Sequence, residues 1–211
     1  GAAVGGSGSR DEFAIDDFNI IVNPTSSQYP TFSGTCQDIN SDANMGLSAD
    51  LTVNGTLTLT NGIINTAGHT LEIGTSISNV GALVRTGGAV RGPVKRWFAT
   101  ATTTSNTLFP VSNYHWVTGS GYTDDYTPVE ISFTSGGPAT GGSLTVAYDT
   151  TGSGTLFDNG GLGYIDVGAQ WPGVNFINLT PQRWIITASG LACFTYDISL
   201  TGNGMNVSTT A

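Results

Sequence analysis

Residue types that perform nucleophilic catalysis are present in the sequence, but they are not arranged for it. The chain contains no G-x-S-x-G motif, the turn that holds a serine nucleophile above a sheet. It has two histidines. His69 follows Gly68 at an expected corner, which favours a surface position. His115 lies between Tyr114 and Trp116, so its side chain is expected on the opposite face of its strand from these aromatic rings. We interpret both histidines as structural or surface residues.

The acidic residues do not form an obvious acid/base couple either. Asp16-Asp17 and Asp124-Asp125 are adjacent pairs, and neighbouring residues on a strand point to opposite faces. Glycoside hydrolysis needs two carboxyl groups about 5–10 Å apart across a cleft. We therefore predict that the protein is not an enzyme and has no catalytic residues.

One acidic stretch has the spacing of a calcium loop. Oxygen-bearing side chains occupy every second position at Asp38, Asn40, Asp42 and Asn44, as in the first half of such a loop. The sixth position is Ala43 where a calcium loop has Gly, and the twelfth is Ala49 where it has Glu. The alternative is a polar turn that leads into the next strand. We predict no required cofactor, with calcium at these four residues as the weaker hypothesis.

Aromatic residues are candidates for stacking on a sugar. Trp97 and Trp184 are expected to fill a core. Trp171 precedes Pro172-Gly173 in a turn, and Tyr122 lies in a stretch rich in Gly and Asp. Trp171 and Tyr122 are therefore the better candidates for an exposed carbohydrate-stacking site.

The overall charge excludes some classes of partner. Six basic residues stand against 15 acidic ones in 211 residues, a net charge of −9. Nucleic-acid binding requires a basic face, so no nucleic-acid partner is expected. No apolar run approaches the roughly 20 residues that cross a bilayer, so no membrane insertion is expected. The two cysteines, Cys36 and Cys193, are compatible either with a disulfide or with two separate thiols.

The composition and the repeats predict an all-β fold. Charged residues make up only 10% of the chain and Gly contributes 30 residues, and no long helical periodicity survives the interruptions. In residues 50–94, glycines recur every five to seven residues between short apolar pairs. This pattern favours a short parallel β-helix-like stretch, and the alternative is an antiparallel meander with Asn-Gly hairpins.

After Trp97 the strands become longer and more aromatic, and turn clusters rich in Gly and Ser separate them. This texture predicts an antiparallel β-sandwich. Expected strands are 96–103, 107–111, 114–118, 127–134, 143–149, 162–167, 174–179, 182–188 and 193–200. The chain then divides into a flexible or partner-bound tail (1–12), an N-terminal strand with the β-helix-like segment (13–95), and a β-sandwich domain (96–211).

Several short motifs resemble a known group of proteins. They lie at residues 29–31 (YPT), 51–57 (LTVNGTL), 88–97 (GAVRGPVKRW), 108–111 (LFPV), 126–131 (YTPVEI) and 183–187 (RWIIT). Together they resemble repetitive secreted or cell-surface β-helix plus β-sandwich proteins of Bacteroidetes-type bacteria, which are associated with type IX secretion. The resemblance implies a secreted, extracellular or cell-surface location. Proteins of this kind usually continue into a C-terminal sorting domain, which this chain lacks.

These observations favour a non-catalytic extracellular structural protein. We expect a self-associating surface or fibre subunit, or an adhesin module, whose main partners are copies of itself. The strand 13–22 is the expected connector between subunits, and its apolar residues are Phe13, Ile15, Phe18, Ile20 and Val22. The alternative function is a carbohydrate-binding module of a larger secreted protein, with a glycan as partner.

Overall fold

The computed structural model describes residues 17–20, 30–104, 106–117, 121–149 and 183–202. These residues form strands, turns and loops, and no helix occurs among them. The predicted all-β class is therefore confirmed. Its physical origin is local, because β-branched and aromatic residues alternate with polar ones over short runs that glycines interrupt.

The N-terminal half is built from three ladders of parallel strands, which we name A, B and C. Ladder A contains β1 (Asp17–Ile20), β3 (Asp38–Ser41), β5 (Thr56–Leu59) and β8 (Ala82–Arg85). Ladder B contains the second part of β2 (Thr31–Cys36), the second part of β4 (Met45–Val53), β7 (Leu71–Ile73) and β10 (Val94–Phe98). Ladder C contains the starts of β2 and β4, then β6 (Ile63–Asn65), β9 (Ala89–Arg91) and the start of β12 (Val111–Val117).

The chain visits the ladders in the order C, B, A and then returns to C. The strand β4 passes through two ladders, because Met45 pairs with Ile64 in ladder C and Leu51 pairs with Leu71 in ladder B. Ladders B and C are therefore joined into one bent sheet. The pairs within residues 50–94 are parallel, so the alternative of antiparallel hairpins in this region is wrong.

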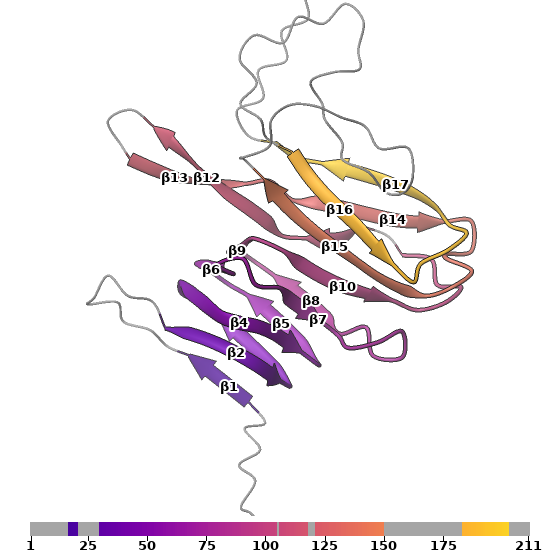
Figure 1. The fold of residues 1–211 in the computed structure, drawn as a ribbon, viewed down its shortest axis with the longest axis horizontal. Helices are drawn as coiled ribbons and strands as arrows, with labels where there is room; N and C mark the ends of the chain where they lie inside the picture. Colours follow the sequence, from indigo (N-terminus) through magenta and orange to yellow (C-terminus); the bar gives the residue numbers. More distant parts are fainter. Residues whose placement is uncertain (1–16, 21–29, 105, 118–120, 150–182, 203–211) are drawn as a thin grey trace, which may run out of the picture.

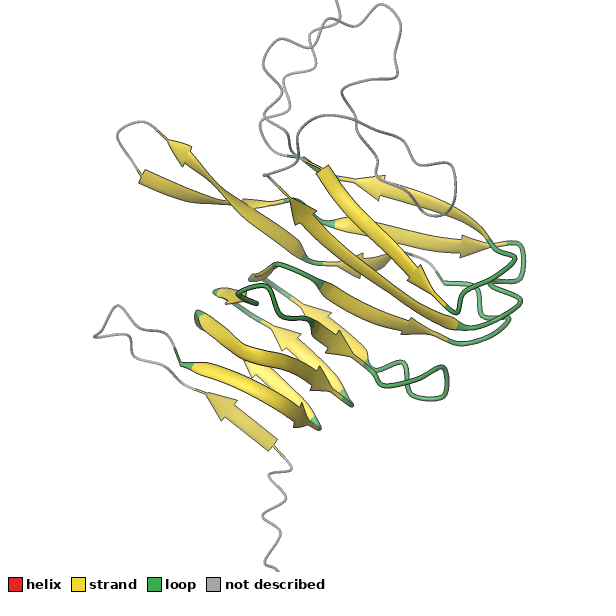
Figure 2. Cartoon of the chain, viewed as in Figure 1, coloured by secondary structure: helices red, strands yellow, loops and turns green. Residues whose placement is uncertain are grey.

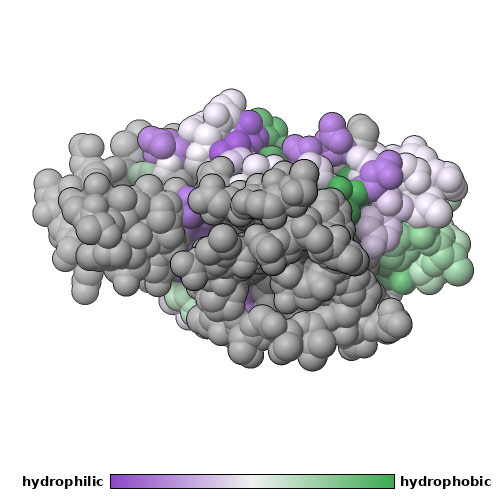
Figure 3. All heavy atoms as spheres, turned by 90° about the horizontal axis from the view of Figure 1, so that it is seen from above, coloured by the Kyte–Doolittle hydropathy of each residue, from purple (hydrophilic) through white to green (hydrophobic). Residues whose placement is uncertain are grey.

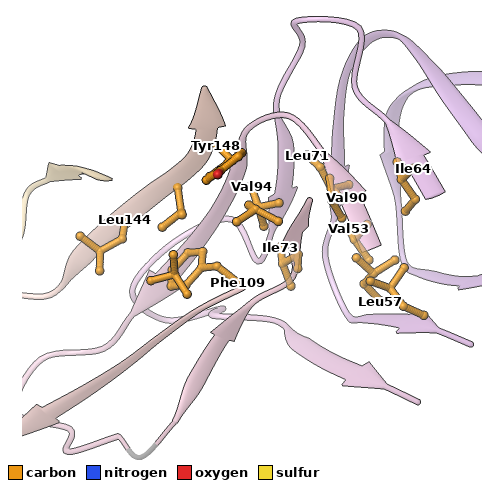
Figure 4. Packing of buried hydrophobic residues seen from close by; sticks show 14 of the residues in the cluster. Val53, Leu57, Ile64, Leu71, Ile73, Val90, Val94, Phe109, Leu144 and Tyr148 are labelled. Carbon is orange, nitrogen blue, oxygen red and sulfur yellow. The ribbon is translucent and has the colours of Figure 1, made fainter. Parts of the chain in front are cut away.

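Buried aliphatic residues line the ladders in register. In ladder B, Leu51 pairs with Leu71, and Leu71 pairs with Val94. Val94 in turn pairs with Val146, and all four side chains are buried. Figure 4 shows the buried side chains of the ladders and how they continue toward Leu144 and Phe109. Truncating such a side chain to Ala would cost about 2–5 kcal/mol.

The C-terminal half consists of antiparallel pairs. The strands are β11 (Thr107–Phe109), β13 (Gly121–Tyr126), β14 (Val129–Thr134), β15 (Gly142–Asp149), β16 (Arg183–Ser189) and β17 (Thr195–Leu200). One sheet continues from β10 through β15 to β16, and a second has the order β11-β14-β17 (Figure 2). The ring of Phe98 on β10 meets that of Phe133 on β14 edge-on, with centroids 4.8 Å apart. These two sheets therefore pack against each other.

The structure revises some expected strands. Residues 121–126 form β13, which pairs with β12 in an antiparallel register that includes Tyr114 and Asp124. The sequence pattern placed this stretch in a loop, because Gly and Asp are poor local strand formers; cross-strand pairing outweighs that preference. The strand β10 spans the expected domain boundary between residues 95 and 96. The expected strands 162–167 and 174–179 lie outside the described residues.

Candidate functional site

The three ladders are closed at one end and open at the other. At the closed end, β10 continues into antiparallel pairing with β15, and β12 pairs with β13. At the other end, among the residues that the structure describes, β1 pairs only with β3 and β2 pairs only with β4. Figure 1 shows β1 and β2 at the side of the molecule farthest from β14 to β17. We call the outer edges of β1 and β2 the open end.

A strand edge exposes backbone N–H and C=O groups that can pair with another strand. At the open end, Phe32 and Cys36 of β2 are partly buried and pack against the core, whereas Thr31, Ser33 and Thr35 are exposed. Gly34 has a φ of +96°, and a Cβ built on it would meet nothing within 4 Å. The final rung of ladder B therefore has empty space where the rungs below it carry Leu51 and Leu71.

The residues predicted for assembly fall partly in this region. Phe18 and Ile20 lie on β1, where Phe18 pairs in register with Ile39 and Ile20 with Ser41. The predicted positions Phe13, Ile15 and Val22 lie outside the described residues. The structure thus brings part of the predicted connector to the open end.

The predicted calcium residues take part in contacts between successive rungs. The Oδ1 atom of Asp38 accepts a hydrogen bond from the backbone N–H of Thr56 at 2.5 Å. Asn44 accepts one from the N–H of Ile63 at 2.7 Å. Asp38 and Asn40 lie on the extended strand β3, and Asn40 and Asp42 are exposed. Two of the four oxygen donors therefore already bind backbone groups, and calcium at these residues stays a prediction.

A third residue, Asp50, completes this pattern of corner contacts. Its Oδ1 atom accepts a hydrogen bond from the N–H of Thr70 at 2.8 Å. His69 lies beside it, with Nδ1 4.0 Å from Asp50 Oδ1, and both side chains are exposed. Sequence reasoning missed these corners, although the recurrence of Asx residues at positions 38, 44 and 50, six residues apart, was a visible signal.

Trp97 belongs to a polar cluster on the outer face of ladder B. Its Nε1 donates a hydrogen bond to Glu72 Oε1 at 2.6 Å. Lys95 Nζ lies 2.8 Å from the same Glu72 oxygen and 4.7 Å from the centroid of the indole ring. The expectation that Trp97 fills the core is wrong. Its strand places it on the face opposite the buried Phe98, and Glu72 supplies the acceptor that its N–H needs.

A row of hydroxyl groups extends this cluster across the sheet. Following the register from strand to strand, the residues are Thr35, Thr52, Glu72, Lys95, Thr145 and Thr187. All of them are partly or fully exposed. This outer face is therefore polar and nearly uncharged apart from one ion pair.

The other aromatic candidates have different outcomes. Trp184 is in the core as expected, with 1% of its surface exposed, and its Nε1 donates to the backbone oxygen of Thr127 at 3.0 Å. Tyr122 lies on β13, and Trp171 lies outside the described residues. The predicted sugar-stacking role of Trp171 and Tyr122 stays a prediction.

Two arginines lie where the ladders meet the antiparallel sheets. The guanidinium of Arg85 lies 3.8 Å from the centroid of the Tyr126 ring, and its Nε donates to the backbone oxygen of Gly88. Burial raises the pKa of Tyr126, and the charge of Arg85 opposes this change. Burial lowers the pKa of Arg96 to about 10. Its Nη1 donates to the backbone oxygen of Leu108 at 2.9 Å, whereas its buried Nε has no partner.

The two cysteines are not bonded to each other, and Cys193 is exposed. Burial, followed by the nearby charge of Asp38, raises the pKa of Cys36. Its Sγ lies 3.6 Å from the backbone oxygen of Thr52. A raised pKa keeps this thiol protonated and unreactive at neutral pH.

Comparisons with known proteins give no family. No family model, no curated protein and no solved structure matches the chain. Within the described part of the chain, no three His, Cys, Asp or Glu residues are grouped so that they could hold a metal ion. The same residues include no helix with the length and apolar character that crossing a membrane requires.

Proposed function

We propose that the chain is a non-catalytic structural protein of the cell exterior that associates with copies of itself through the open end. It would serve as a subunit of a surface layer or fibre, or as an adhesin module. In this proposal the three ladders are a short parallel β-helix, and the facing antiparallel sheets are a β-sandwich that caps it. The observation that carries the proposal is the asymmetry of the ladders, which end in paired strands on one side and in the free edges of β1 and β2 on the other.

The surface chemistry supports close packing of copies. Charged residues make up 10% of the chain, so bringing two copies together removes few ions from water. Described residues on the face in Figure 3 carry hydrophilic, intermediate and hydrophobic side chains next to each other. Backbone pairing at a strand edge would then supply the directional part of the contact.

The test compares the intact chain with a variant lacking residues 1–22. Light scattering and negative-stain electron microscopy measure the size of the particles. We expect assemblies from the intact chain and monomers from the shortened one. A matched control is Ile77→Ser, which removes an exposed apolar side chain (44% exposed) away from the open end and should leave assembly unchanged. Monomeric particles from the intact chain at all concentrations would contradict the proposal.

The outer face of ladder B favours one alternative, a carbohydrate-binding module. Trp97 is partly exposed there beside Glu72 and Lys95, and the hydroxyls of Thr145 and Thr187 continue the row. An aromatic ring next to hydroxyl and charged groups is a usual arrangement for binding sugars. Retention of the chain on insoluble glycans, reduced by Trp97→Ala, Trp171→Ala or Tyr122→Ala, would support this alternative. No retention on any glycan would remove it.

A further inference from the structure

The position of β1 fixes where the chain upstream of it begins. Asp17, the first residue of β1, pairs in register with Asp38. Asp38 comes two residues after Cys36, the last residue of β2. Because β1 and β3 are parallel, the chain that enters β1 arrives from the same corner as the chain that leaves β2. The residues immediately before Asp17 therefore start next to the open edge of β2.

The sequence before β1 repeats the pattern of β2 and β3. In the described rung, Gly34 and Cys36 on β2 are followed by Ile39 and Ser41 on β3. The constant offset of the β1–β3 pairing places Phe18 opposite Ile39 and Ile20 opposite Ser41. Extending this offset upstream places Phe13 opposite Gly34 and Ile15 opposite Cys36.

The apolar alternation selects this register over its neighbours. With the three-residue step that joins Cys36 to Ile39, Ile15 precedes Phe18 by the same step, and Phe13 and Ile15 take the inner positions. A shift of one residue would place Ala14 and either Glu12 or Asp16 there, because side chains alternate between faces. Burying an unpaired carboxylate is much more costly than burying Phe and Ile.

The open end also has room for this strand. The backbone of Gly34 has no neighbour within 4 Å of a built Cβ, so the space above Leu51 can take a large ring. Cys36 is only partly buried and would gain cover from Ile15.

We propose that residues 13–16 add a parallel strand to the open edge of β2 in the same chain, with Phe13 opposite Gly34 and Ile15 opposite Cys36. This strand and β1 together form the outermost rung of the ladders. The proposal does not depend on self-association. If the proposed function holds as well, the edge that meets a second copy is the edge of this rung.

The test uses Cys36 as a reporter of the register. The full chain carries Cys193→Ser to remove the second native thiol, and Ile15→Cys places a new thiol opposite Cys36. Neighbouring strands lie about 4.8 Å apart, within the Cα separation of about 4.4–6.8 Å that a disulfide spans. Diamide takes up two electrons and two protons as the two thiols become a disulfide. Ala14→Cys is the matched control, because its thiol would lie on the opposite face.

We expect a disulfide within one chain for Ile15→Cys at low protein concentration, and at most a small fraction for Ala14→Cys. Non-reducing electrophoresis and peptide mass mapping measure both. Equal cross-linking of the two variants, or none in either, would overturn the register. A disulfide between two chains would overturn the placement within one chain, while it would support the proposed self-association.

A second measurement does not depend on disulfide chemistry. Phe13→Ala should lower the melting temperature by several degrees because it empties the space above Gly34, whereas Ala14→Ser should leave it unchanged. An unchanged melting temperature for Phe13→Ala would contradict the proposed packing. Light scattering on the same variants reports self-association separately, so failure of the register and failure of the proposed function can be distinguished.

Discussion

The Oδ1 atom of Asp38 accepts a hydrogen bond from the backbone N–H of Thr56, its register partner in the next rung of ladder A. Asn44 makes the corresponding contact with Ile63, and Asp50 makes it with Thr70. Each of these side chains satisfies a backbone donor at a corner, where the regular ladder begins or is interrupted. They connect one rung to the next in the same way at three positions.

Removing the acceptor at such a corner should destabilise the fold. Asp38→Ala leaves the N–H of Thr56 without its partner, and we expect a loss of about 1–2 kcal/mol in the free energy of unfolding. Asp38→Asn keeps an acceptor oxygen and should lose less. Urea unfolding of the two variants and the parent measures the difference. Equal losses would show that the hydrogen bond is not the source of the effect.

Gly92 is expected to be intolerant of a side chain. Its φ is +122°, and a Cβ built there would overlap Thr66 Oγ1. Gly68 is the matched control, since it also has a positive φ (+91°) but no atom within 4 Å of a built Cβ. Both Ala variants carry the backbone strain, which is about 1 kcal/mol or more. Gly92→Ala adds overpacking of about 1–3 kcal/mol.

Thermal or urea unfolding of the two variants checks this prediction. The parent chain and the double variant Gly92→Ala/Thr66→Ala belong in the same series. Relieving the overlap at Thr66 should recover part of the loss at Gly92. Similar losses for Gly92→Ala and Gly68→Ala would mean that the surroundings of Gly92 adjust at little cost.

The charge of Arg96 is expected to contribute little to stability. This residue pairs in register with Ile73 on one side and Leu144 on the other, and both of these are fully buried. Replacing a buried charge by an apolar side chain of similar length is often neutral or stabilising. Arg96→Met should therefore stay within about 1 kcal/mol of the parent or exceed it, whereas Arg96→Ala should lose about 2 kcal/mol or more through a cavity.

Chemical denaturation of both Arg96 variants provides the measurement. Nη1 of Arg96 donates to the backbone oxygen of Leu108, so Met forfeits one hydrogen bond that Arg makes. A loss for Arg96→Met as large as that for Arg96→Ala would show that this hydrogen bond outweighs the cost of burying the charge.

The stability of the fold should fall in alkali through Tyr148. Burial, followed by the charge of Asp125, raises the pKa of Tyr148 to about 12 from 10.0. A raised pKa means that the folded chain keeps its proton longer than the unfolded chain. The contribution of Tyr148 is therefore complete below pH 10 and disappears as the pH rises toward 12.

The corresponding test compares free energies of unfolding at about pH 9 and about pH 11, on either side of the tyrosine pKa in an unfolded chain. Tyr148→Phe should show a smaller decrease between the two values than the parent, because it has no phenol to ionise. Tyr196→Phe is the control at an exposed ring (40% exposed). A decrease of the same size in the parent and in Tyr148→Phe would rule out this phenol as the source.

The sequence by itself determined the fold class and the use of the glycines. Short β-branched and aliphatic runs cannot form helices when Gly and Asn interrupt them every few residues. Gly62, Gly74, Gly81 and Gly88 all have positive φ values in the structure, as the punctuation of residues 50–94 suggested. The buried position of Trp184 also followed from the alternation on its strand.

Tertiary structure decided what local patterns do not encode. Parallel pairing joins residues far apart in sequence, such as Leu57 and Leu83, and nothing in either short run specifies its partner. The same applies to Trp97, whose position depends on Glu72 in a different strand. Asp38 and Asn44 had the spacing of a metal loop, but their backbone partners come from the next rung. Long-range register is set by the packing of the whole ladder, and a local motif cannot show it.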